Sequence, residues 1–211
     1  TGSGNDAEQS TPGSQPQIYN GSAVITENGK PTLKFNGAQK LDTNYAPQLG
    51  AGATADYYAA SVATQSASNT GHIWRATGSA IIFGRFQNTG ETRVLARDSN
   101  STSLPITSSV VALNTQILQG ALLNNGTVSN YINGSIDGTG STTFTGNFNI
   151  SGNIIIGSLN TSEYLTGNVQ EFIFYATDQT SNRSGIETDI NAHFRIYQPT
   201  TQPTSGLLYD Y

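Results

Sequence analysis

The stretch Val169–Tyr175, with the sequence VQEFIFY, is the clearest candidate strand in the chain. Aromatic and β-branched residues dominate it, and these residue types favour the pleated, half-buried surface of a sheet. Further short apolar runs precede it at residues 116–123 and 153–157, and turn sequences such as Asn124–Gly126 and Asn133-Gly134 separate them. Asparagine and glycine accept the positive φ that tight turns need. Many short strands joined by such turns predict an all-β sandwich or barrel.

The first half of the chain carries weaker strand signals of the same kind. We expect strands at residues 32–35 and 56–65, and a hairpin that joins residues 79–87 to residues 91–97 across Asn88–Gly90. A turn that contains glycine between two apolar runs is typical of a β-hairpin. The chain is therefore expected to consist mainly of strands, with one exception near its C-terminal end.

One segment follows a helical pattern instead. Ile186, Ile190 and Phe194 recur at intervals of four residues, which places them on one face of a helix. Ser184 and Glu187 have the spacing of a capping box, in which the hydroxyl and the carboxylate bind free N–H groups at the helix start. We predict a short helix from residue 184 to residue 194, packed on the edge of the sandwich.

Composition argues against several classes of function. The 211 residues carry a formal net charge of −5, and only 11% of them are charged. Nine lysines and arginines scattered along the chain predict no basic patch, so we expect no nucleic-acid partner. No apolar run reaches the length of a membrane span, so we expect no membrane insertion. Without cysteine the chain has no disulfide framework and no thiolate metal site.

Local composition indicates how the chain is divided. Residues 1–16 are polar and rich in glycine and proline, and residues 198–203 have the Thr/Gln/Pro-rich composition of a linker. We expect an extended lead-in from a preceding segment at 1–17, a sandwich at 18–197, and a linker with the start of a following module at 198–211. A chain without methionine is also expected to be a piece of a longer protein.

Three stretches together resemble a known family. They are Gly29–Gly37 (GKPTLKFNG), Tyr131–Gly134 (YING) and Gly167–Tyr175 (GNVQEFIFY). In order and spacing they are similar to the opening strand, the hairpin and the closing strand of the concanavalin A-like lectin/glucanase sandwich in its laminin-G-like form. The resemblance covers residues 18–197 and implies an all-β, two-sheet jelly-roll sandwich with one short C-terminal helix.

Two further segments resemble parts of phage structural proteins. Gly2–Gln9 is similar to the end of a segment that precedes such sandwiches, and Asp178–Glu187 is similar to the helix entry of phage virion sandwiches. This resemblance implies a fibre, tail or capsid-surface protein, located on the virion surface or otherwise extracellular. Other virion proteins or copies of the same chain are then expected as partners. Because fold does not determine function, the residues themselves must carry any statement about chemistry.

Catalysis is the less favoured interpretation of the acidic residues in the chain. Glycoside hydrolysis needs two carboxylates about 5 to 9.5 Å apart across a cleft. The paired acidic signature of the glucanase members is absent, and a serine-hydrolase elbow is absent as well. We therefore expect no enzyme, with a glycanase on host polysaccharide as the alternative. The acidic side chains that such an enzyme would draw on are Asp56, Asp98, Asp137 and Glu171.

A sugar-binding patch is the favoured interpretation of residues 66–76, which we expect to form a loop. Sugars bind through aromatic rings that stack on C–H faces and through planar polar groups that pair with hydroxyls. Tyr57 and Tyr58 point to opposite faces of a strand, so we expect only Tyr57 to join the patch. A core position for Trp74 is the alternative. The candidate ligand-binding residues are Asn69, His72, Trp74, Arg75 and Tyr57.

Calcium is the one cofactor that the resemblance suggests, because a calcium site is common in this family. Calcium prefers hard oxygen ligands, which Asp42, Asp98 and Asn100 supply from expected loops. The alternative is that these groups are solvated loop side chains, since no D-x-D-x-D loop is present. No other cofactor is expected.

Three hypotheses follow from the sequence. The leading one is a non-catalytic carbohydrate-binding or host-attachment module of a phage virion structural protein, with a glycan or host-surface polysaccharide as its partner. The second is a purely architectural domain that decorates a virion and packs against neighbouring proteins. The third is the glycanase.

Overall fold

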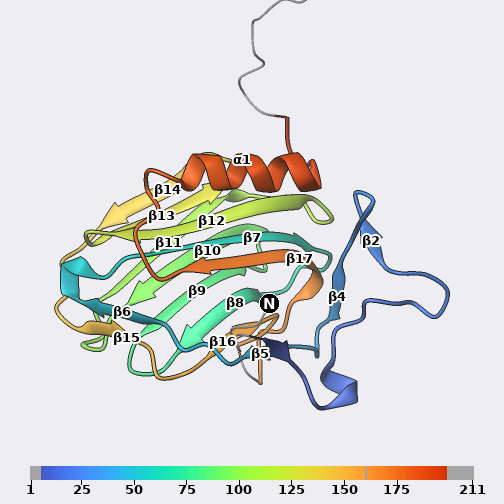
Figure 1. The fold of residues 1–211 in the computed structure, drawn as a ribbon, viewed down its shortest axis with the longest axis horizontal. Helices are drawn as coiled ribbons and strands as arrows, with labels where there is room; N and C mark the ends of the chain where they lie inside the picture. Colours follow the sequence, from blue (N-terminus) through green and yellow to red (C-terminus); the bar gives the residue numbers. More distant parts are fainter. Residues whose placement is uncertain (1–5, 160, 199–211) are drawn as a thin grey trace, which may run out of the picture.

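The computed structural model describes residues 6–159 and 161–198 and shows a β-sandwich with one helix (Figure 1). We call its two large antiparallel sheets sheet A and sheet B. The seven strands of sheet A are, in spatial order, β1 (Ala7–Glu8), β5 (Leu41–Thr43), β16 (Ile154–Ile156), β8 (Gly71–Thr77), β9 (Ile81–Phe86), β10 (Glu91–Arg97) and β11 (Ser103–Val110). The six strands of sheet B are β14 (Ser135–Ser141), β13 (Thr127–Ile132), β12 (Gln116–Asn124), β7 (Tyr57–Gln65), β17 (Thr166–Tyr175) and β4 (Leu33–Asn36).

Smaller elements complete the fold. The remaining strands form two pairs, β15 (Asn147–Asn149) with β6 (Gln48–Ala51) and β2 (Thr26–Glu27) with β3 (Lys30–Pro31). The helices are α1 (Arg183–Phe194) and the 3-10 turns η1 (Pro12–Ser14) and η2 (Gly52–Thr54). The predicted all-β, two-sheet jelly roll with one C-terminal helix is confirmed. Among the described residues no helix is long and apolar enough to cross a membrane.

The segments that decided the sequence prediction lie where the pattern placed them. β4 pairs with β17, and Phe35 lies opposite Gly167, so two of the three family-like stretches are neighbours in sheet B. The expected hairpin is formed by β9 and β10, with Arg85 opposite Arg93. Asn133 has a φ of 53° at the turn between β13 and β14, as the Asn-Gly sequence predicts. Local turn chemistry therefore determines much of the strand order.

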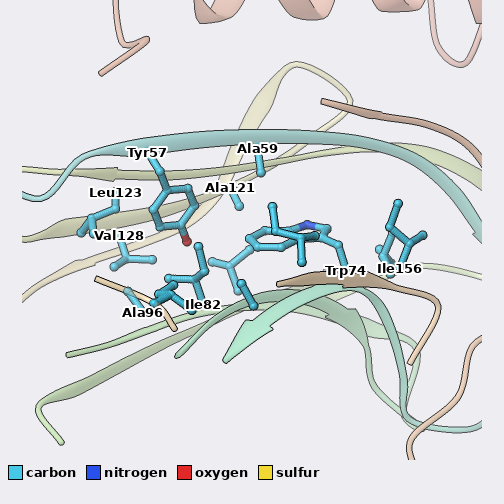
Figure 2. Packing of buried hydrophobic residues seen from close by; sticks show 14 of the residues in the cluster. Tyr57, Ala59, Trp74, Ile82, Ala96, Ala121, Leu123, Val128 and Ile156 are labelled. Atoms are coloured by element: carbon cyan, nitrogen blue, oxygen red, sulfur yellow. The ribbon is translucent and has the colours of Figure 1, made fainter. Parts of the chain in front are cut away.

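The core lies between the two sheets and is centred on aromatic rings. Trp74 and Tyr57 are buried there, with ring centroids 6.2 Å apart, and Figure 2 shows both between the sheets. Phe174 of β17 stacks on Tyr57 at 5.7 Å. Gly84 lies opposite Trp74 across β8 and β9, and a Cβ at this position would lie 2.5 Å from the indole Nε1. Glycine at residue 84 is therefore what makes room for the indole ring.

A second apolar cluster lies on the outer face of sheet B, where α1 covers it. Ile190 and Phe194 pack there with Tyr58 and Leu118, and the helix runs alongside β12 (Figure 1). The predicted apolar face of the helix is confirmed, whereas the predicted position on the sandwich edge is wrong. The helix covers a sheet face because alternate residues of β7 and β12 present apolar side chains outward.

The predicted capping box is wrong as well. Asn182 is the N-cap residue, and its side chain makes no capping hydrogen bond. Glu187 is only 1% exposed, accepts a hydrogen bond of 2.9 Å from the hydroxyl of Tyr58, and forms an ion pair with Arg183. Its carboxylate therefore ties the helix to sheet B, and it is not free to cap the helix start.

The two ends of the chain differ in what the structure describes. Ala7–Glu8, within the segment expected as a lead-in, form β1 and pair with β5 at the edge of sheet A. The expected linker and following module at 198–211 lie outside the described residues, apart from Gln198.

Adjacent tyrosines on β7 give a matched test of this arrangement. Tyr57 points into the core, where its hydroxyl is buried without a hydrogen-bond partner among the described residues. We expect Tyr57→Phe to raise the free energy of unfolding by about 1 kcal/mol, because it removes an unsatisfied polar group. Tyr58→Phe removes the hydrogen bond to the buried Glu187 and should lower it by about 1–3 kcal/mol. Urea denaturation of both variants measures the two free energies of unfolding. Equal changes would contradict the inward position of Tyr57 and the outward position of Tyr58.

Candidate functional site

The outer face of sheet A carries most of the arginines of the chain. Along β10, Val94 and Ala96 are buried in the core, and Arg93 and Arg97 alternate with them and face outward. On the neighbouring strands Arg85 lies opposite Arg93, and Arg75 lies opposite Phe83. Four of the six arginines in the sequence therefore gather on one sheet face. We call this surface, defined by Arg75, Arg85, Arg93 and Arg97, the arginine face.

One carboxylate from a distant loop enters this surface. Glu163, in the segment that follows β16, accepts a hydrogen bond of 2.9 Å from Nη1 of Arg85, and Nε2 of His72 lies 2.9 Å from the same oxygen. The carbonyl of Glu163 also accepts a hydrogen bond from the backbone N–H of His72, and its φ of 47° is left-handed. Glu163 is thus held at both its backbone and its side chain.

His72 is a neutral member of this cluster. Its side chain is 1% exposed, and burial, together with the charges of Arg85 and Arg75, lowers its pKa to about 3. An ionised carboxylate only accepts hydrogen bonds, so Nε2 of the neutral ring carries the proton that Glu163 accepts. The ring packs edge-on against Phe83 at 4.8 Å, and the guanidinium of Arg85 lies 5.0 Å over Phe83. His72 therefore orients Glu163 and supports Arg85.

The guanidinium groups act on one another as like charges. Burial lowers the pKa of Arg75 from its ordinary value, Glu163 raises it, and Arg97 and Arg85 lower it further. Burial and the charge of Arg85 also lower the pKa of Arg93. The Nε atom of each of the four arginines is buried and has no hydrogen-bond partner among the residues that the structure describes. The four side chains are partly exposed and therefore form one cationic surface, with their Nε atoms on its buried side.

The structure separates the five residues predicted to bind a ligand. His72 and Arg75 belong to the arginine face, and Asn69 lies at its border, where Nδ2 donates a 2.9 Å hydrogen bond to the carbonyl of Tyr164. Trp74 and Tyr57 are 1% and 0% exposed and lie in the core, so their rings offer no surface to a ligand. The alternative placement of Trp74 in the core is the one observed.

The local reason is that residues 71–77 form strand β8, not the loop that was predicted. β8 pairs with β16 and β9, and a bulge between His72 and Trp74 shifts the register. Consequently Trp74 points inward and Arg75 points outward. The prediction that the scattered cations form no basic patch is also wrong. The residues of the face that sequence reasoning missed are Arg85, Arg93, Arg97 and Glu163.

The predicted metal ligands do not converge. Asp98 is buried, and its carboxylate accepts backbone hydrogen bonds of 2.8, 2.9 and 2.7 Å from Thr102, Thr145 and Gly146. Burial raises its pKa, but these N–H groups lower it more, so the net shift is downward. The carboxylate thus holds two turns together.

The other two candidates lie apart or are engaged elsewhere. Asn100 donates a 3.2 Å hydrogen bond to the hydroxyl of Thr145, and Asp42 on β5 forms an ion pair with Lys40. Four strand spacings, about 19 Å, separate β5 from β10. In the described part of the chain no three His, Asp or Glu side chains form a group that could hold a metal ion. A calcium ion remains a prediction from the resemblance.

The four acidic residues considered for hydrolysis lie on different elements. Asp56 precedes β7 and accepts a hydrogen bond from the backbone N–H of Asn125, and Asp137 of β14 accepts hydrogen bonds from Ser109. Glu171 lies in β17, and burial raises its pKa while the charge of His193 of α1 lowers it. Glu171 is therefore near the helix, on the side of the molecule opposite the arginine face.

Two cavities of similar size lie away from the arginine face. One, of about 400 Å³, lies between α1 and the turn at Asn133, and its buried carboxylate, Glu187, is already bound by Tyr58 and Arg183. The other, of about 390 Å³, opens between the sheets and is lined mainly by apolar side chains such as Phe172. The first cavity is lined by one guanidinium group, that of Arg195, and the second by none, whereas the arginine face gathers four.

Several solved structures share the fold of this chain, although no relative is found by sequence. No protein-family model matches the chain, and no curated protein matches it in sequence. The native heptameric SAP-like pentraxin of Limulus polyphemus aligns with a TM-score of 0.58 at 15% identity, over 76% of this chain and 82% of the pentraxin chain. The chain is therefore similar to a pentraxin over most of both molecules.

Two toxin domains align as well. The binding domain of Paraclostridial Mosquitocidal Protein 1 gives a TM-score of 0.61 at 13% identity, over 85% of this chain and 48% of that domain. The receptor binding domain of botulinum neurotoxin type G gives 0.58 at 14% identity, over 87% of this chain and 47% of that domain. The chain spans about half the length of each toxin domain. At such identities the likeness establishes the fold alone, and it confirms the predicted concanavalin A-like jelly-roll sandwich.

The buried neutral His72 has a measurable consequence. Its ring signals should stay at their neutral-form chemical shifts from about pH 8 to about pH 5. Below about pH 6.5 the unfolded chain binds a proton at His72 that the folded chain does not bind. His72 should therefore reduce stability by about 1.4 kcal/mol for each unit of pH decrease, until about pH 3. Nuclear magnetic resonance of the imidazole signals checks this, and a titration midpoint near 6.5 would contradict it.

Proposed function

We propose that this domain is a non-catalytic carbohydrate-binding module that holds its ligand on the outer face of sheet A. One observation carries the proposal: the arginine face presents four partly exposed, planar guanidinium donors beside the aliphatic side chain of Leu95, while α1 covers the outer face of the other sheet. Hydroxyl and acidic groups of sugars pair with such donors, and the C–H faces of sugars pack on apolar side chains.

The comparisons support a binding role over a catalytic one. The two toxin domains are described as a binding domain and a receptor binding domain. The carboxylates that a glycanase would need lie before β7, after β10, on β14 and on β17, and Asp98 is occupied by backbone N–H groups. Retaining and inverting glycosidases both need two carboxyl groups facing one bound sugar. We therefore propose attachment to a glycan, not its cleavage.

We extend the proposal to the biological context. Gly2–Gln9 and Asp178–Glu187 resemble segments of phage structural proteins, which favours a domain of a fibre, tail or capsid-surface protein. On a virion surface, or in another extracellular setting, such a domain would bring a particle to a host-surface polysaccharide.

An array of neutral and acidic glycans tests the proposal. We expect the chain to bind at least one glycan class, and Leu95→Glu to weaken that binding by about tenfold or more, because it removes the aliphatic contact and places a carboxylate among the guanidinium groups that would otherwise bind the ligand. Ile136→Glu is the matched control, because Ile136 is 56% exposed on β14 and its replacement adds the same charge elsewhere. Binding to no glycan, or equal losses in both variants, would sink the proposal.

A purely architectural role on a virion is the second candidate, and one observation favours it. An arm of the chain projects from the sandwich near β2 (Figure 1). In the segment that precedes β2, Ile18, Tyr19 and Val24 are 53%, 53% and 49% exposed, and Tyr19 pairs with Val24 in an isolated β-bridge. Exposed apolar side chains that cluster in this way often mark contacts with other proteins.

The architectural role predicts self-association of the purified chain, with other virion proteins as further partners. Sedimentation velocity should show an oligomer that Tyr19→Ser converts to monomer, because the substitution removes an apolar ring from the arm. Ile136→Ser is the control outside the arm. A monomer at every concentration would contradict self-association through this arm.

A further inference from the structure

We infer that the ligand of the arginine face is an acidic polysaccharide, a chain that carries carboxylate or sulfate groups on successive sugar units. This inference rests on the proposed function and names the substrate class of the same site. Three independent features of the face lead to it: its charge, the donor geometry of its side chains, and the spacing of those side chains.

The charge of the face is opposite to that of the chain as a whole. The sequence has a formal net charge of −5, yet four of its nine lysines and arginines lie on this one surface. Only Arg85 forms an ion pair with an acidic side chain among the described residues of the face, and that partner is Glu163. Cations gathered against their mutual repulsion attract anions and concentrate them near the surface. An anionic ligand is therefore favoured over a neutral one.

The donor geometry is suited to planar anions. A guanidinium group presents its N–H donors as a rigid fork that binds carboxylate or sulfate through two parallel hydrogen bonds, whereas lysine acts as a point charge. β8, β9 and β10 carry arginines and no lysine. Arg93 and Arg97 make no side-chain hydrogen bond or ion pair within the part of the chain that the structure describes, and both residues are partly exposed, so the outer ends of their guanidinium groups are open to a ligand. The face is built for bidentate binding.

The spacing requires more than one anionic group. Arg93 and Arg97 are four residues apart on β10, so their Cα atoms are separated by about 13 Å. One carboxylate or sulfate does not bind both side chains in the bidentate geometry. Leu95 lies between them and offers an aliphatic surface for the C–H face of a sugar ring. A polysaccharide with charged groups on successive units meets all three positions.

Nucleic acid is the other polyanion, and the face is less suited to it. Proteins that bind single strands stack bases on exposed aromatic rings. The ring in this face, Phe83, is only 8% exposed because His72 and Arg85 pack against it.

Isothermal titration of the chain with polygalacturonate, dextran sulfate and neutral dextran tests the inference. We expect binding to one or both polyanions, none to dextran, and weaker binding as salt is added. The double variant R93Q/R97Q should lose about tenfold or more in affinity, because it removes two guanidinium forks. The matched control K30Q/K34Q removes the same charge from β3 and β4 and should stay within about twofold of the unsubstituted chain.

Further variants and ligands keep the outcomes distinct. If R93Q/R97Q does not fold, R93K/R97K keeps the charge, and it should still weaken binding because lysine lacks the fork. Binding to neutral glycans that Leu95→Glu weakens but neither arginine variant changes would overturn the acidic ligand and leave the proposed function standing. Binding to no glycan at all would overturn both. Single-stranded DNA bound in place of the polysaccharides, with the same dependence on Arg93 and Arg97, would also overturn the inference.

Discussion

Trp74 lies between the two sheets, packed against Tyr57 and opposite Gly84, whose missing Cβ leaves room for the indole. Because side chains alternate along a strand, these two buried rings determine where their neighbours point. Arg75 follows Trp74 and faces outward from sheet A, and Tyr58 follows Tyr57 and faces outward from sheet B. A one-residue slip of either strand would bury a guanidinium group and expose a ring, so the aromatic core sets the register of both sheets.

The outer faces of the two sheets differ in chemistry, and this difference explains why α1 covers one of them and not the other. The outer face of sheet B is apolar, and Ile190 and Phe194 of α1 cover it, each burial contributing about 1.5–3 kcal/mol. The outer face of sheet A carries guanidinium groups, and covering them with an apolar element would remove them from water at a large cost. One face therefore completes the fold, and the other stays available for a charged ligand. His72 and Glu163 maintain the second face by anchoring Arg85 from a distant loop.

Much of the fold follows from local signals in the sequence. Alternation and turn residues predict the β9–β10 hairpin, and the repeat of Ile186, Ile190 and Phe194 predicts α1. The position of the helix was not predictable, because it depends on which sheet face is apolar once both sheets have formed. Even Glu187, whose spacing from Ser184 indicates a capping box, instead accepts a hydrogen bond from the hydroxyl of Tyr58.

Only part of the candidate site could be predicted from the sequence. The predicted hairpin already places Arg85 near Arg93. The prediction of a loop at residues 66–76, however, gave no basis for expecting the outward position of Arg75 or the burial of Trp74. A lone tryptophan is compatible with a core or a sugar platform, and only the pairing of β8 decides between them. Ligand binding at the arginine face is tested most directly by the Nε–H signals of the six arginines in nuclear magnetic resonance spectra. On titration with an oligogalacturonate, the signals of the four arginines of the face should shift while those of Arg183 and Arg195 stay in place. Shifts confined to Arg183 and Arg195 would show that the ligand does not bind at the arginine face.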